Sequence, residues 1–117
     1  MKDGTERRSS QHLKGVLDMC LLALISEEPC YGYEMVQKME ERGLEVVGEG
    51  SIYPLLSRLQ KGGLIEGYMV PSEEGPRRKY YRVLPEGEAT LRVWGEEWAG
   101  FVRAVERVIG ERSGVEN

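Results

Sequence analysis

Five side chains that form hydrogen bonds or carry positive charge recur at helical spacing in the middle of the chain. They are Ser51, Tyr53, Ser57, Arg58 and Lys61, with Pro54 beside them. Hydroxyl groups donate and accept hydrogen bonds, and guanidinium or ammonium groups bind phosphates. Such side chains on one face of a helix, with an apolar face behind, suit the reading of base edges in a DNA groove. The same residues would also make an ordinary solvated helix face, so both interpretations stay open.

A second basic group, Arg77, Arg78 and Lys79, follows a loop that contains Pro, Ser, Glu and Gly. Residues 51–83 carry six basic and three acidic side chains, although the whole chain has a formal net charge of −4. Charges are screened over about 8 Å at physiological salt, so the local excess decides contact with a polyanion. We expect this basic group to lie on a phosphate backbone or in a minor groove. The alternative is a solvated turn.

Three helices, a hairpin and a long last helix are predicted to position these groups. Apolar residues at i, i+3, i+4 and i+7 indicate the helices, and aromatic and β-branched residues indicate the strands. The expected helices span 13–25, 31–42, 51–61 and 85–110, and the expected strands span 64–70 and 79–84. This order predicts a winged helix-turn-helix, a mainly α fold with a small β-hairpin and a long C-terminal helix. The domains expected are a flexible arm (1–12), a winged helix-turn-helix DNA-binding domain (13–84), a C-terminal dimerisation helix (85–112) and a tail (113–117).

The last helix carries a seam of apolar side chains that step by three and four residues. They are Leu91, Trp94, Trp98, Phe101, Val105 and Val108. A heptad seam packs against another helix. The first helix is apolar all round from Met19 to Ile25, which indicates cover from more than one side. We expect a second copy of the chain to supply that cover, so the six seam residues together with Met19 and Leu22 are the predicted dimer interface.

Composition restricts the class of protein. The 117 residues suit one domain, 31% of them are charged, and no apolar run is long enough to span a bilayer. The polar start of the chain is unlike a secretory signal, and Cys20 and Cys30 alone make no disulfide framework, so a cytoplasmic location is expected. A single histidine, with no metal-ligand cluster, nucleophile–base pair or phosphate-binding glycine loop, predicts a protein that is not an enzyme and holds no metal or cofactor.

Four segments of the chain resemble the PadR family of transcriptional regulators. They are Leu13-Lys14-Gly15 with Leu17-Asp18, then Tyr31-Gly32-Tyr33-Glu34, then Gly50-Ser51-Ile52-Tyr53-Pro54-Leu55-Leu56-Ser57-Arg58-Leu59 closed by Gly63-Leu64-Ile65, and finally Gly75-Pro76-Arg77-Arg78-Lys79-Tyr80-Tyr81-Arg82. The third segment is the most specific. Together they keep the family's order and spacing over residues 13–87, and the single helix after the wing is similar to the short subfamily.

The resemblance implies a homodimeric winged-helix repressor that binds double-stranded DNA at inverted-repeat operators. It matches Tyr53 and Pro54 to the family's DNA-contacting motif. Lys14 and Tyr31 are further candidates for contacts to flanking phosphates. A winged-helix module that binds only proteins, without sequence-specific DNA binding, is the alternative.

The resemblance also implies a small, aromatic or drug-like effector, as several members of the family respond to such compounds. Trp94 and Trp98 lie four residues apart, and aromatic faces favour planar and cationic ligands. We therefore expect them to form a stacking platform at the dimer axis, with Met19, Asp18 and Val102 lining the same space. The alternative is that both tryptophans are simply dimer core.

Overall fold

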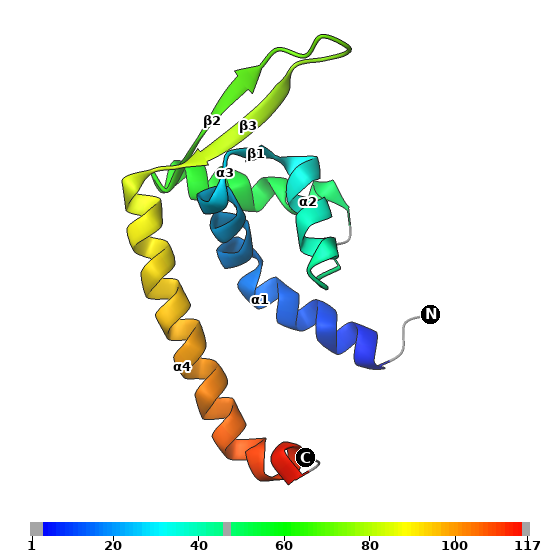
Figure 1. Cartoon of the computed structure of the whole chain (residues 1–117), viewed down its shortest axis with the longest axis vertical. Helices are drawn as coiled ribbons and strands as arrows, with labels where there is room; N and C mark the ends of the chain where they lie inside the picture. Colours follow the sequence, from blue (N-terminus) through cyan, green and yellow to red (C-terminus); the bar gives the residue numbers. More distant parts are fainter. Residues whose placement is uncertain (1–3, 46–47, 116–117) are drawn as a thin grey trace.

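The computed structural model describes residues 4–45 and 48–115. Its elements are, in order, α1 (Gly4–Glu27), β1 (Cys30–Tyr31), α2 (Gly32–Glu41), the 3-10 turn η1 (Glu49–Ser51), α3 (Tyr53–Lys61), β2 (Ile65–Val70), β3 (Arg78–Val83) and α4 (Pro85–Val115). A helical body carries a hairpin that projects from it, and α4 runs away on the other side (Figure 1). The predicted fold class, mainly α with a small sheet and a long last helix, is confirmed.

The sheet has three antiparallel strands in the order β1-β3-β2. In the hairpin, Ile65 pairs with Val83 and Val70 with Arg78. On the other side of β3, Tyr31 of β1 pairs with Tyr80. Strand β1 was not predicted, because two residues are too few to show the alternation that marks a strand. Its consequence is that the start of α2 is tied to the hairpin.

The core is built around α1, which contacts α2, α3, β3 and α4. Its side chains Leu21, Leu22 and Ile25 expose at most 1% of their surface. The prediction that Leu22 belongs to a dimer interface is therefore wrong, since this side chain lies in the protomer's own core. The all-round apolar stretch of α1 is covered largely by its own domain.

Two helices are longer than the sequence predicted. Helix α1 begins at Gly4 rather than Leu13, so the expected arm is helical from that residue on. Helix α4 continues to Val115, beyond the expected start of the tail. Both extensions lack the regular spacing of apolar residues from which the helices were predicted. They contain Glu, Arg and Gln, which favour helix through their intrinsic propensity. Residues 1–3 and 116–117 lie outside the described part of the chain.

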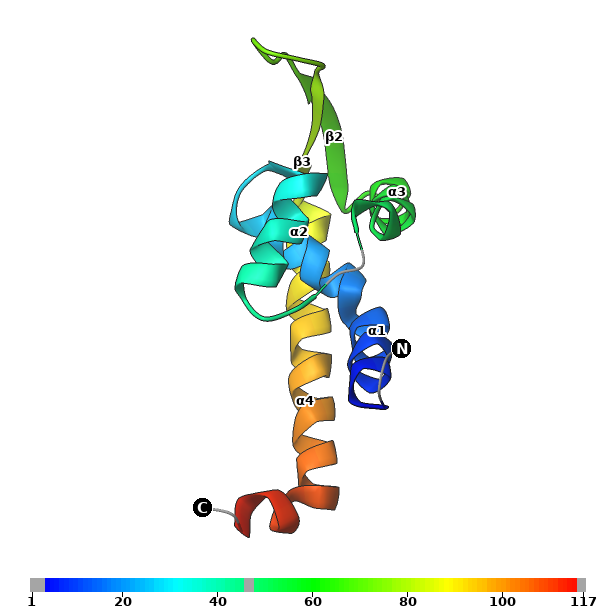
Figure 2. The same ribbon diagram turned by 90° about the vertical axis from the view of Figure 1, so that its right-hand side faces the viewer.

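Helix α4 is closely joined to the base of the hairpin. The Leu84 backbone N–H donates to the Leu64 carbonyl over 2.9 Å. One turn into α4, a Cβ added to Gly87 would lie 2.1 Å from the same carbonyl oxygen. Only a glycine lets the helix approach this closely. The direction of α4 is thereby set relative to the hairpin (Figure 2).

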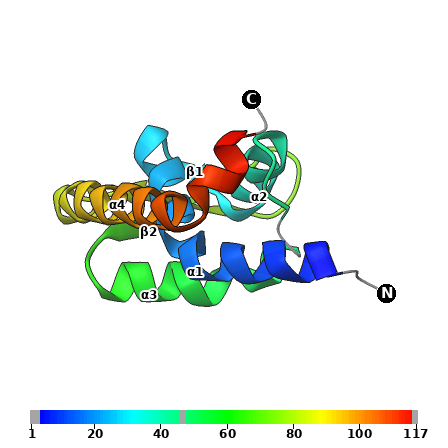
Figure 3. The ribbon, with the colours of Figure 1, turned by 90° about the horizontal axis from the view of Figure 1, so that it is seen from below.

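Helix α3 lies at one edge of the domain, with its outer side uncovered by other elements (Figures 2 and 3). Its inner side is buried, because Ile52 and Leu56 expose none of their surface and Leu59 only 4%. The helix is therefore held from behind and presents a face to solvent.

Candidate nucleic-acid interface

The exposed face of α3 carries the predicted polar group. Pro54 stands in the first turn, where its missing N–H has no helical partner to lose. The turn before it is fixed by the Ser51 hydroxyl, which donates to the Gly48 carbonyl over 2.9 Å. The structure places the whole predicted set on the solvent side: Ser51, Tyr53, Pro54, Ser57, Arg58 and Lys61 are all exposed.

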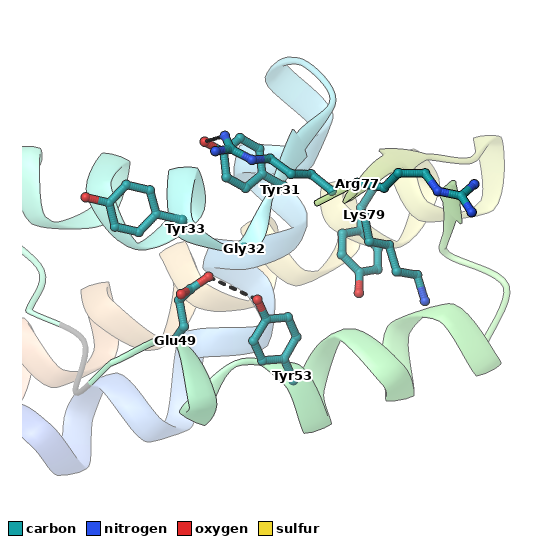
Figure 4. Close-up of a pocket in the computed structure, with 9 residues that line it drawn as sticks. Tyr31, Gly32, Tyr33, Glu49, Tyr53, Arg77 and Lys79 are labelled. Atoms are coloured by element: carbon teal, nitrogen blue, oxygen red, sulfur yellow. Dashed lines mark hydrogen bonds between the residues drawn. The ribbon is translucent and has the colours of Figure 1, made fainter. Parts of the chain in front are cut away.

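A cleft of about 630 Å³ lies between the start of α3, the start of α2 and the wing, which is the hairpin formed by β2, β3 and the loop that joins them. It joins the two groups that the sequence singled out, because Tyr53 lies on one side and the basic residues of the wing on another (Figure 4). Its lining residues are Tyr31, Gly32, Tyr33, Glu49, Tyr53, Arg77, Arg78, Lys79 and Tyr81. Cations beside tyrosine hydroxyls make a surface suited to phosphate oxygens.

Tyr53 is held at the floor of this cleft by a carboxylate. Its hydroxyl donates to Glu49 Oε2 over 3.0 Å, while 45% of the residue stays exposed. A Cβ on Gly32 would lie 2.6 Å from the Tyr53 hydroxyl oxygen, so glycine at this position lets the pair approach the start of α2. Burial, and then the hydrogen bond to Glu49, raise the pKa of Tyr53 above its ordinary value. The hydroxyl therefore remains a donor at neutral pH.

Tyr31 positions one of the wing cations. The Arg78 guanidinium lies 4.7 Å from the centre of the Tyr31 ring and donates to the Tyr31 hydroxyl. The Tyr31 ring in turn packs on Tyr80, with 5.1 Å between ring centres. On the core side of the sheet, Lys79 Nζ lies 5.4 Å from the centre of the buried Tyr81 ring. Arg78 and Lys79 are thus pre-positioned on aromatic rings, which lowers the conformational entropy that they lose on binding.

Some predicted residues lie elsewhere. Ser57, Arg58 and Lys61 continue along α3 beyond the cleft lining. Lys14 lies on α1, but its side chain falls outside the described part of the structure, and its predicted phosphate contact remains a prediction.

Sequence reasoning missed three side chains of the cleft: Tyr33, Glu49 and Tyr81. Only Glu49 had a usable signal, since it precedes Tyr53 by four residues, the spacing of neighbours on a helix. The other two reach the cleft from α2 and β3, whose meeting depends on the tertiary fold.

The predicted seam on α4 divides into two parts. Leu91 and Trp94 are half-buried against the protomer's own core. Farther along, Trp98, Phe101 and Val108 expose 43%, 62% and 85% of their surface. The Trp98 and Phe101 rings contact each other, with centres 6.0 Å apart. Among the described side chains of α4, those of the seam beyond Trp94 are therefore largely uncovered by the rest of the chain. The remaining predicted effector residues, Met19, Asp18 and Val102, are half-buried.

Over residues 4–45 and 48–115, no group of three or more His, Cys, Asp or Glu is arranged to hold a metal ion. In the same ranges, no helix combines the length and apolar character needed to cross a membrane.

The sequence profile of the family described as "Transcriptional regulator PadR-like family" matches residues 21–93, which is most of the winged helix and the start of α4. The chain belongs to this family. A PadR-like transcriptional regulator from Bacillus cereus has a similar structure, with 44% identity, a TM-score of 0.75, and coverage of 85% of this chain and 96% of that one. A PadR family regulator from Eggerthella lenta superposes with a TM-score of 0.81 at 28% identity, covering 90% and 91% of the two chains.

Among curated proteins, the PadR-like chain is similar to an uncharacterized protein from Lysinibacillus sphaericus. The two are 37% identical over 92 residues, which is 77% of this chain and 84% of the relative. The family is one of transcriptional regulators. The family resemblance seen in the sequence is thereby confirmed.

Proposed function

We propose that this PadR-like protein is a homodimeric repressor that binds an inverted-repeat operator in double-stranded DNA. The observation that carries the proposal is the cleft that Arg77, Arg78 and Lys79 line together with Tyr53 at the exposed start of α3. A recognition helix enters the major groove while phosphate contacts fix its register. On this proposal α3 reads base edges and the wing cations bind the flanking backbone.

The dimer would be formed through the uncovered half of α4. Large apolar side chains at heptad spacing pack against a second helix, and Trp98, Phe101 and Val108 have no cover in one protomer. Two copies of α3 would then face successive major grooves about one helical turn apart, which explains the symmetry expected of the operator.

A small aromatic effector would bind between the two α4 helices. The contact between Trp98 and Phe101 already forms part of an aromatic surface there. A ligand at this place would change the spacing of the two recognition helices and so lower the affinity of the protein for its operator. By linkage, bound DNA would lower the affinity for the ligand by the same factor. Quenching of Trp98 fluorescence by a planar cation such as proflavine tests this, with Trp94→Leu retaining the quenching and Trp98→Leu losing it. Equal quenching in both variants would place the ligand elsewhere.

The DNA proposal is tested by binding to the DNA upstream of the protein's own gene, beside a scrambled duplex, at several salt concentrations. We expect specific binding by one dimer per site and a steep loss of affinity with salt. Each phosphate contact adds about 0.9 to the slope of log K against log salt. Because a dimer carries two copies of each residue, the variant Arg77→Gln with Lys79→Gln removes four cations from the complex and should reduce the magnitude of that slope by up to about 4.

The matched control removes the same number of positive charges outside the cleft. It is Arg92→Gln with Arg103→Gln, both of which are exposed on α4. It should leave the slope unchanged. A second test removes contacts at the recognition helix with Tyr53→Ala and Arg58→Ala. A folded double variant that kept full operator affinity would show that α3 is not the DNA face. Weak binding with no sequence preference, even after selection from random DNA, would favour a module that contacts only proteins.

A further inference from the structure

A single carboxylate, that of Glu49, lies among the nine residues that line the cleft. The other polar side chains there are cations and tyrosine hydroxyls, which suit phosphate. A carboxylate repels phosphate and therefore lowers the affinity for DNA in general. A carboxylate accepts hydrogen bonds, and phosphate oxygens are acceptors too. A favourable contact of Glu49 with DNA therefore requires a hydrogen-bond donor on a base.

The Glu49 carboxylate is held in one place. Its Oε2 accepts a hydrogen bond from the Tyr53 hydroxyl at 3.0 Å, and the residue is half-buried. The same oxygen would lie 3.3 Å from a Cβ on Gly32, so it rests against the first residue of α2. Because a carboxylate has two oxygens and several lone pairs, it can accept a second donor while keeping Tyr53.

The position of Glu49 suits contact with a base rather than with the backbone. It lies in η1, directly before α3 (Figure 4), and the first residues of a recognition helix are those that reach base edges. The cations that would bind phosphate stand on another wall of the cleft, on the wing. In the major groove, the base-edge donor that pairs with a carboxylate is the N4 amino group of cytosine.

We propose that Glu49 determines specificity by accepting a hydrogen bond from the N4 amino group of a cytosine in each operator half-site. Tyr53 positions the carboxylate for this contact. At guanine or thymine the carboxylate would be desolvated against acceptors, and at adenine the N7 acceptor beside the N6 amino group would repel it, so the wrong sequence is disfavoured. This inference rests on the proposed DNA-binding function and adds to it the base that this residue reads.

The test begins with the wild-type protein selecting duplexes from a random-sequence pool. Each position of the selected half-site is then replaced in turn, and affinity is measured for the wild type, Glu49→Gln, Tyr53→Phe and the control Glu40→Gln. Glu40 is exposed on α2 and its substitution makes the same change in charge outside the cleft. Circular dichroism checks that the four proteins are equally folded.

For the wild type we expect one half-site position where replacing the C·G pair by T·A costs about tenfold in affinity, since thymine presents an acceptor there. Glu49→Gln should lose most of that preference, because an amide both donates and accepts. It should also bind scrambled DNA more tightly, as a negative charge has been removed. Glu40→Gln should keep the wild-type base preference.

An unchanged base preference in Glu49→Gln would overturn the inference while leaving the proposed function intact. The inference would also be overturned if Glu49→Gln and Tyr53→Phe both lost the same factor of affinity on every duplex. That result would show that Glu49 only orients the Tyr53 hydroxyl. Failure of the wild type to select any sequence would overturn the proposed function itself. The wild-type arm therefore separates the two failures.

Discussion

Gly32 lies beside Tyr53 and Glu49, at the surface proposed to bind DNA. Its missing side chain leaves the room that the Tyr53 hydroxyl and the Glu49 carboxylate occupy. Both of those side chains are only partly buried, so displacing them costs little in packing. The position therefore matters more for the shape of the cleft than for the stability of the fold.

We predict that Gly32→Ala weakens operator binding by about tenfold with little change in thermal stability, since one displaced interfacial contact typically accounts for that factor. The added Cβ, 2.6 Å from the Tyr53 hydroxyl oxygen, forces that ring to move. Gly15→Ala is the control, because no heavy atom lies within 4 Å of its added Cβ. Fluorescence anisotropy with labelled operator measures the effect. Full affinity in Gly32→Ala would show that Tyr53 binds DNA from another position.

Cys30 illustrates how burial controls thiol chemistry. The residue exposes none of its surface, and burial raises the pKa of its thiol to about 11. Burial, and then the charge of Asp18, also raise the pKa of the half-buried Cys20 thiol. Since the thiolate is the reactive form, neither group is poised as a redox sensor at neutral pH.

We predict that a disulfide reagent at pH 7 labels Cys30 only as fast as the protein opens, and labels Cys20 faster. The variants Cys20→Ser and Cys30→Ser isolate the two reactions, which are followed by absorbance. Addition of urea should accelerate the labelling of Cys30 strongly. If Cys20→Ser reacted at the rate of a free thiol in the native state, the burial of Cys30 would be contradicted.

At the scale of elements, two glycines of α4 should respond to alanine in opposite ways. Gly87 packs against the Leu64 carbonyl, and a Cβ there would lie 2.1 Å from the oxygen. Gly95 has no heavy atom within 4 Å of an added Cβ and is exposed. The same substitution therefore separates tertiary packing from helix propensity.

We predict that Gly87→Ala lowers the free energy of unfolding by about 1–3 kcal/mol, the usual cost of overpacking. Gly95→Ala should raise it by roughly 0.5–1 kcal/mol, because alanine favours helix. Urea denaturation followed by circular dichroism measures both. Equal effects of the two substitutions would mean that α4 is not closely joined to the hairpin in solution.

Elements whose apolar residues recur at regular spacing could be predicted from the sequence, and elements that form only through tertiary contacts could not. Leu56 and Leu59 mark the inner side of α3 in the sequence and are buried in the structure. The paired strand at Tyr31 and the approach of Tyr81 to the cleft arise only once β1 pairs with β3. Leu22 was assigned to the wrong interface because a helix that is apolar all round does not reveal which neighbours cover it.

At the scale of the whole molecule, the uncovered half of α4 bears on the oligomeric state. Phe101 and Val108 expose 62% and 85% of their surface, which is a large apolar area for a monomer to leave in water. We predict that the wild type sediments as a dimer and that Phe101→Glu with Val108→Glu sediments as a monomer. Sedimentation equilibrium measures both. The control is Val93→Glu, which also places a glutamate at an exposed apolar position of the same helix, but outside the seam.

If the charged double variant sedimented as the wild type does, the seam would not be the dimer interface. A monomeric variant should also bind a single half-site duplex with nearly wild-type affinity and lose its advantage on the full inverted repeat. This second readout distinguishes loss of the dimer from loss of the DNA face.

The tight contact between Gly87 and Leu64 gives the molecule the mechanics of a lever. Helix α4 runs in one direction over residues 85–110, about 39 Å at 1.5 Å per residue, before its last turns bend aside (Figure 2). Each degree of tilt at the contact with Leu64 moves the far end of this straight part by about 0.7 Å. In the other direction, a displacement of one ångström at the far end corresponds to a rotation of only about one to two degrees where α4 meets the hairpin.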